Sequence, residues 1–84
     1  MIRAYKGIRP TLGRRAWVDS SAQVIGAVEL GEDASIWMNT VVRGDVNRIR
    51  IGARTNVQDN CVLHVTAQHP TTLADEVTVG HFVT

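Results

Sequence analysis

Three histidines are the residues of this chain best suited to chemistry, because an imidazole can bind a transition metal or act as a general base near neutral pH. They are His64, His69 and His81. His69 lies directly before Pro70, where we expect a loop with a solvated side chain. A zinc site usually takes three protein ligands and keeps one position open for water. His64 and His81 are therefore the predicted metal ligands, and they do not make a full set.

A second group of polar residues lies before His64 in the sequence: Arg43, Asp45, Asn56, Gln58 and Asp59. A guanidinium and a carboxylate form a planar, bidentate ion pair, so Arg43 and Asp45 are suited to fixing a loop or a subunit contact. Structural alternatives exist for this group. Asn56 and Asp59 have short side chains that stabilise turns, and Arg43 is also compatible with a solvated charge.

The elements that must position these residues follow from an aliphatic residue at every sixth position. The repeat comprises Leu12, Val18, Val24, Leu30, Ile36 and Val42, then Ile51, Val57 and Leu63, then Leu73 and Val79. A helix turns about 100° per residue, so a six-residue step does not return to the same face. In a strand, where side chains alternate between two faces, a step of six residues does return to the same face. Short strands joined by corners predict an all-β parallel β-helix of hexapeptides; a β-sandwich would not keep this period.

A second column supports the repeat, because a small or β-branched residue follows four positions after each aliphatic one. Its members are Ala16, Ala22, Val28, Ala34, Thr40, Val46, Thr55, Cys61, Ala67, Val77 and Val83. We expect both columns to face the interior of the coil. Cys61 is thus predicted to be a small buried core residue rather than a catalytic thiol.

The period resembles that of left-handed hexapeptide-repeat proteins, which implies triangular coils of about 18 residues with three faces. Counting faces in order puts Val79 on the second face and Leu63 on the third. His64 follows Leu63 and His81 comes two residues after Val79, so the two histidines lie on different edges of the coil. A metal bound by both would have to lie between neighbouring subunits.

Two insertions interrupt the repeat. Val42 and Ile51 are nine residues apart, and we assign Asn47, Arg48 and Arg50 to the extra segment. Leu63 and Leu73 are ten apart, and that segment holds Gln68, His69, Pro70 and Thr71. Insertions in a solenoid leave one corner as loops, and such loops often carry function.

Composition limits the remaining possibilities. The 84 residues suffice for one small domain, residues 1–84, of about four coils. A formal net charge of +1 gives no indication of nucleic acid or an acidic membrane as a partner. No apolar run approaches a transmembrane span. A lone cysteine allows no internal disulfide, which is consistent with a cytoplasmic protein.

Two further features point to contacts outside the coil. Trp17 and Trp37 lie next to core positions, so both should point outward and are candidates for subunit packing. The final hexapeptide, Val79 to Thr84, has no capping segment after it, although solenoids need caps. We therefore expect a fragment or truncated member of a longer family, without the usual C-terminal coils and helix.

Several motifs, taken jointly, resemble the γ-class carbonic anhydrase family, above all its members without acidic loops. They are Val42-Arg43-Gly44-Asp45, Ile51-Gly52, Thr55-Asn56-Val57-Gln58-Asp59, Val62-Leu63-His64 and Val79-Gly80-His81. The resemblance covers the whole chain, roughly the first half of a typical member. It implies a homotrimer with a metal at each subunit interface, zinc by preference and iron or cobalt as alternatives, and CO2 and bicarbonate as ligands.

The resemblance also implies roles for single residues. His64 is one ligand, His81 reaches the metal shared with the neighbouring subunit, and the remaining ligand would come five residues after His81, beyond Thr84. Arg43 pairs with an acidic residue across the trimer, and Asp45 organises the active-site side. Asn56 and Gln58 orient the metal-bound water and bicarbonate. The inserted segments contain no glutamate to carry protons away, so we expect weak or no hydration of CO2 by this truncated chain.

Two other functions stay open at this point. The chain is also compatible with a hexapeptide acyltransferase or acyl-CoA thioesterase, in which His64 or His69 would act as a general base. A non-catalytic oligomerisation scaffold, assembled through its exposed terminal strand, is the third hypothesis.

Overall fold

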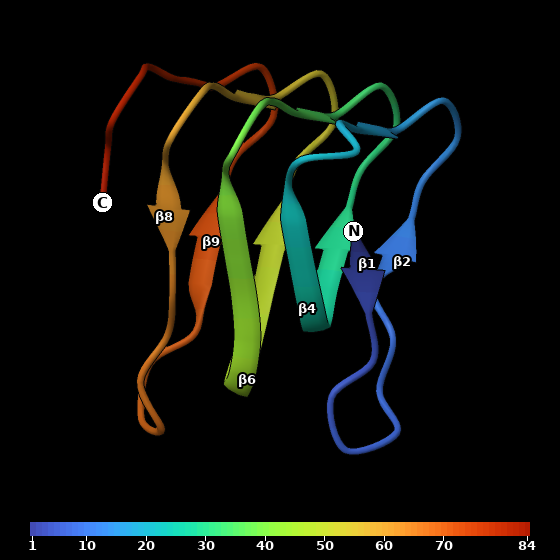
Figure 1. Ribbon diagram of the computed structural model, residues 1–84, viewed down its shortest axis with the longest axis vertical. Helices are drawn as coiled ribbons and strands as arrows, with labels where there is room; N and C mark the ends of the chain where they lie inside the picture. Colours follow the sequence, from blue (N-terminus) through green and yellow to red (C-terminus); the bar gives the residue numbers. More distant parts are fainter.

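Ten short strands and no helix make up the computed structural model, which describes residues 1–84 (Figure 1). The strands are β1 Ile2–Arg3, β2 Thr11–Leu12, β3 Trp17–Val18, β4 Gln23–Leu30, β5 Ser35–Ile36, β6 Val41–Ile51, β7 Asn56–Val57, β8 Val62–Leu63, β9 Thr71–Leu73 and β10 Thr78–Val79. No helix is present that is long and apolar enough to cross a membrane.

The strands form two sheets, and within each sheet all paired strands are parallel. One sheet has the order β1-β4-β6-β8, with β2 beside β4 and β9 beside β6, and the other has the order β10-β7-β5-β3. Each turn of the chain visits both sheets before it rises to the next turn (Figure 1). The predicted all-β parallel β-helix of about four coils is confirmed.

Strand register gives the length of each coil. Val18 pairs with Ile36 and Val24 with Val42, so an uninterrupted coil spans three hexapeptides, as predicted. Ile36 then pairs with Val57, and Val57 pairs with Val79, so the two coils that follow are longer than this uninterrupted one. The longer coils absorb the insertions, while the aliphatic column stays aligned from coil to coil.

The first insertion lies earlier than predicted. Gly26 pairs with Gly44, but Val28 pairs with Ile49, so residues 45–48 of β6 stand opposite Ala27 alone. Val46, predicted to be a core position, is 57 % exposed, and Ile49 takes its place in the core at 1 % exposed. Arg50 was wrongly assigned to the insertion, because it pairs in register with Glu29.

The later i+4 positions also need correction. In the second insertion Ala67 is exposed, and Val65 is buried instead. Val83, near the end of the chain, is 42 % exposed. Among the aliphatic positions, Leu12 lies in the first coil and is 40 % exposed, because no coil covers it on the other side.

A third insertion escaped the sequence reasoning. Ile2 pairs with Val24 and Leu12 with Leu30, so the chain makes an extra loop, residues 4–10, between the first two strands. Register places this loop, residues 45–48 and residues 64–70 at the same corner, which is at the bottom of Figure 1. The second coil crosses that corner in β4, with no insertion.

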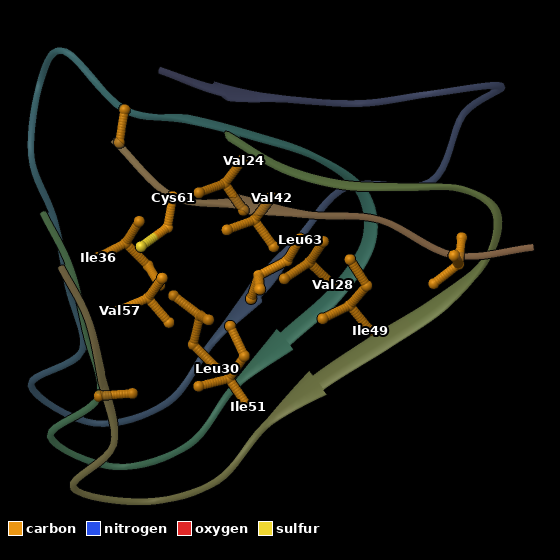
Figure 2. Packing of buried hydrophobic residues seen from close by; sticks show 13 residues of the cluster. Val24, Val28, Leu30, Ile36, Val42, Ile49, Ile51, Val57, Cys61 and Leu63 are labelled. Atoms are coloured by element: carbon orange, nitrogen blue, oxygen red, sulfur yellow. The ribbon is translucent and has the colours of Figure 1, made fainter. Parts of the chain in front are cut away.

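The core is the aliphatic column predicted from the repeat. Thirteen buried residues form one cluster, and Figure 2 shows Val24, Leu30, Ile36, Ile51 and Val57 pointing into the space that the coils enclose. Side chains of about this size contribute roughly 1.5–3 kcal/mol each when fully buried. Cys61 is fully buried with this cluster, as predicted, and its Sγ lies 2.8 Å from the carbonyl oxygen of Gly80.

One corner repeats the same turn in successive coils. A residue with left-handed backbone conformation recurs there in each coil, and the charges alternate along this column: Arg15, Asp33, Arg54 and Glu76. The Arg15 guanidinium donates to both Asp33 carboxylate oxygens, at 2.8 and 2.9 Å. Beside this column Gly31 has no room for a side chain, because a Cβ there would lie 2.6 Å from the backbone nitrogen of Ala53.

Candidate functional site

Arg43, Asp45 and His64 meet at the corner that carries the insertions. Val41 pairs with Val62 and Val42 with Leu63, so the next residues along the two strands, Arg43 and His64, become neighbours. The Arg43 Nε lies 3.1 Å from His64 Nε2 and 3.1 Å from Asp45 Oδ2. Asp45 Oδ1 lies 3.0 Å from the same His64 nitrogen. The three side chains form one cluster, called here the corner triad.

The corner triad brings both a cation and an anion to one ring nitrogen of His64. In one neutral tautomer Nε2 carries the proton and donates to Asp45, which leaves Nδ1 with its lone pair. In the other, Nε2 accepts from Arg43 and Nδ1 carries the proton. Because Asp45 is ionised, the carboxylate favours the first tautomer, in which Nδ1 can accept a proton or bind a metal. Arg43 Nη2 lies 3.4 Å from Nδ1, so the half-exposed guanidinium must turn aside for a metal to bind there.

Asp45 is the least exposed residue of the triad, and its carboxylate is held by a backbone hydrogen bond. Its side chain is 17 % exposed, whereas those of Arg43 and His64 are 50 % and 39 % exposed. The backbone N–H of Val46 donates to Asp45 at 2.7 Å, and this bond, with smaller contributions from His64 and Arg43, lowers the pKa of the carboxyl despite its partial burial. Asp45 is therefore an anion at neutral pH, held in one orientation beside the imidazole.

Residues of the insertions hold the backbone around the triad. The Thr71 hydroxyl donates to the carbonyl oxygen of His64 at 2.7 Å. The Asn47 side-chain amide lies 3.3 Å from the carbonyl oxygens of Thr66 and Ala67, and so joins two inserted segments. Thr71 and Asn47 were noted only as insertion residues, because their partners depend on which coils the loops stack against.

Asn56 and Gln58 form a separate polar row on the other sheet. The Gln58 amide donates to Asn56 Oδ1 at 3.0 Å, and the Asn56 amide donates to Thr78 Oγ1 at 3.0 Å. Thr78 was missed by the sequence reasoning, although it pairs with Asn56 in the register of β7 and β10. No hydrogen bond joins this row to the corner triad, so the predicted site residues of a single chain fall into two groups.

The remaining histidines are apart from both groups. His81 follows β10 of one sheet and is exposed, whereas His64 follows β8 of the other sheet. His69 is exposed in the insertion, as expected, and its backbone N–H bonds to Thr66 Oγ1. No three His, Cys, Asp or Glu side chains of this chain come close enough to hold a metal together.

Trp17 and Trp37 both point outward from the sheet that carries Asn56. They are 43 % and 37 % exposed, and their rings meet edge to face with centroids 4.7 Å apart. Trp37 Nε1 donates to Ser35 Oγ at 2.9 Å, which fixes its ring. An exposed aromatic pair of this kind is suited to packing against another chain.

Comparison with known proteins gives relatives of two kinds. The chain is 46 % identical over 83 residues to a carbonic anhydrase of Geobacillus kaustophilus, matching 99 % of this chain and 46 % of that protein. It is 45 % identical over 78 residues to gamma carbonic anhydrase 1, mitochondrial, of Arabidopsis thaliana, over 86 % of this chain and 28 % of the relative.

A solved structure from Anaplasma phagocytophilum, described as a hexapeptide transferase family protein, superposes with a TM-score of 0.90 at 41 % identity, over 96 % of this chain and 47 % of that one. No family model matches the sequence. The chain spans about half the length, or less, of the proteins it resembles.

Proposed function

Because the chain belongs to the hexapeptide-repeat family, which includes gamma carbonic anhydrases and hexapeptide transferases, we propose that it acts as a metal-dependent carbonic-anhydrase-like protein. His64 and the neighbouring copy's equivalent of His81 would hold the metal. The single observation that carries the proposal is the contact between His64 and the ionised Asp45.

That contact fits the chemistry of a metal site. Histidine ligands nearly always give their second ring nitrogen to a carboxylate or carbonyl, which fixes the tautomer and makes the binding nitrogen more basic. Asp45 supplies such a carboxylate at 3.0 Å. Zinc bound there would supply a hydroxide at neutral pH, by lowering the pKa of its water to about 7.

The chain's other polar residues have roles that follow from their positions. Arg43 lies against His64 and is half-exposed, so its charge is available to attract bicarbonate. The row of Gln58, Asn56 and Thr78 leaves amide and hydroxyl groups on one sheet face, where they would orient water or a small oxyanion at a subunit contact. We propose a homotrimer, because no hydrogen bond joins the triad to the row within one chain, and a site that uses both would need a neighbouring copy.

The test is hydration of CO2, followed by a pH indicator in a stopped-flow instrument, with zinc-loaded and chelated protein. His64→Ala should abolish any zinc-dependent rate, and His69→Ala should leave it unchanged, since His69 contacts nothing in the triad. A zinc-dependent rate that survives His64→Ala would contradict the proposal.

A second function is supported by the same corner triad and by the likeness to a hexapeptide transferase. A carboxylate that orients a neutral imidazole also makes a general base, as acyl transfer needs, and this role requires no metal. Acyl transfer from acetyl-coenzyme A to small amines and alcohols, measured in the presence of a chelator, separates the two functions. Activity that persists without metal, and falls in His64→Ala, would favour the transferase.

A further inference from the structure

A groove with a basic rim lies at the corner where the second coil carries no insertion. It is about 380 Å³ in volume and lies between the loop of residues 4–10 and the insertion of β6. Ile8 of the loop, which is exposed, and Ala27 of β4, which is half-buried, provide apolar surface. Arg9, Arg48 and Arg50 surround it. None of these residues belongs to the corner triad or to the row of Asn56 and Gln58.

The groove exists because of the coil register. Ala27 alone passes the corner in the second coil, whereas four residues pass it in the third and a whole loop passes it in the first. The second coil is thus recessed between two projecting segments. Stacked coils repeat at the strand spacing of about 4.8 Å, so the two flanks are separated by roughly 10 Å. A gap of that width admits a planar ring or a short aliphatic group.

The charges around the groove are unbalanced. Arg50 Nε lies 3.3 Å from Glu29 Oε1, which is the only carboxylate in the lining. Arg9 and Arg48 make no ion pair and no side-chain hydrogen bond. Two free guanidinium groups therefore approach the groove from opposite flanks, although the whole chain has a net charge of only +1.

We propose that this groove binds a small organic anion, with its apolar part on Ile8 and Ala27 and its carboxylate or phosphate between Arg9 and Arg48. Guanidinium groups pair with both kinds of oxyanion through two parallel hydrogen bonds. The apolar surface selects ligands that carry a ring or chain over bare inorganic ions. The Glu29–Arg50 pair closes one side and disfavours a second negative group there.

The experiment is a titration of the 84-residue chain with phenyl phosphate, benzoate, inorganic phosphate and benzyl alcohol, followed by amide chemical shifts in NMR. We expect saturable shifts at residues 27–29 with phenyl phosphate or benzoate, and the stronger of the two identifies the preferred oxyanion. Inorganic phosphate and benzyl alcohol should bind more weakly, because each has only half of the recognised chemistry. Equal binding of inorganic phosphate, or no saturable shift with either aromatic anion, would overturn the proposal.

Variants that remove one positive charge provide a second test of the same binding. Arg9→Gln and Arg48→Gln should each weaken binding about fivefold or more, as expected for loss of a charge-assisted hydrogen bond at a partly exposed site. Arg14→Gln is the matched control, because Arg14 is exposed, makes no ion pair and lies outside the groove. Equal weakening by Arg14→Gln would mean non-specific attraction and would overturn the proposal. A change of sedimentation in Arg48→Gln without ligand would mean that a second copy fills the groove, and it would also overturn the proposal.

Discussion

Leu30 and Leu12 form a matched pair that tests how the coils are stabilised. They lie opposite each other in register on neighbouring strands, β4 and β2. Leu30 is 1 % exposed, with a coil on either side, whereas Leu12 is 40 % exposed in the first coil. The same substitution, Leu→Ala, therefore removes the same atoms from a closed and from an open environment.

The expected magnitudes follow from burial. Three carbon atoms at about 0.8 kcal/mol each give roughly 2.4 kcal/mol of lost transfer free energy for Leu30→Ala, and the enclosed cavity raises the loss to about 3–5 kcal/mol. For Leu12→Ala about three-fifths of the transfer term applies, roughly 1.5 kcal/mol, and no closed cavity forms. A domain of this size has roughly 4–13 kcal/mol in total, so Leu30→Ala removes a large share.

The assay is equilibrium unfolding in urea, followed by far-ultraviolet circular dichroism at one fixed protein concentration. The urea concentration at the transition midpoint should fall at least twice as far for Leu30→Ala as for Leu12→Ala. The slope of the unfolding free energy against urea concentration should stay unchanged. Equal losses, or a loss below about 1 kcal/mol for Leu30→Ala, would refute the stacked-coil core on which the positions of His64 and Asp45 depend.

Three further predictions test the register, the close stacking and the charged column. Ile49→Ser should destabilise the chain strongly and Val46→Ser hardly at all, because Ile49 is buried and Val46 is 57 % exposed. If urea unfolding shows the larger loss for Val46→Ser, then Val46 occupies the core position, as predicted from the sequence, and the observed register is wrong. Gly31→Ala should lower the melting temperature by several degrees, because its Cβ would meet backbone of the next coil at 2.6 Å; an unchanged melting curve would contradict that packing. The Arg15 guanidinium lowers the pKa of Asp33, so this ion pair stabilises the fold above the unfolded-state pKa of about 3.9 and is lost as pH falls through the lower folded-state pKa. Asp33→Asn should therefore lose less stability than the wild type between about pH 4.5 and about pH 2.5, and parallel pH profiles would exclude this role.

The fold could be predicted from the sequence because the solenoid repeats one simple requirement. An aliphatic residue at each sixth position suffices to specify strand faces and core, and Leu30, Ile36 and Val57 are buried as the count predicted. The coil length of three hexapeptides came from the resemblance to left-handed hexapeptide-repeat proteins. The position of the first insertion could not be predicted. Spacing shows that the segment is too long for the repeat, but Val46 and Ile49 both suit a core position, and only the pairing of Val28 with Ile49 decides between them.

The candidate site was predictable in its residues and not in its contacts. His64, Asp45 and Arg43 were singled out from motifs, yet their mutual contacts depend on the register between the neighbouring strands β6 and β8. The polar row of Asn56 and Gln58 was assigned to the same centre, and within one chain it lies on a different sheet. Metal identity, trimer formation and cytoplasmic location stay predictions.

Whether the corner triad binds a metal through His64 can be measured by calorimetric titration of the wild type and of Asp45→Asn with zinc. Asp45 Oδ1 lies 3.0 Å from the imidazole and would not itself touch the metal, so its loss should weaken zinc binding about 10–100-fold while the fold remains. We predict that weakening, together with a complete loss of zinc binding in His64→Ala. Unchanged zinc affinity in both variants would contradict the claim that the corner triad is built around a metal-binding histidine.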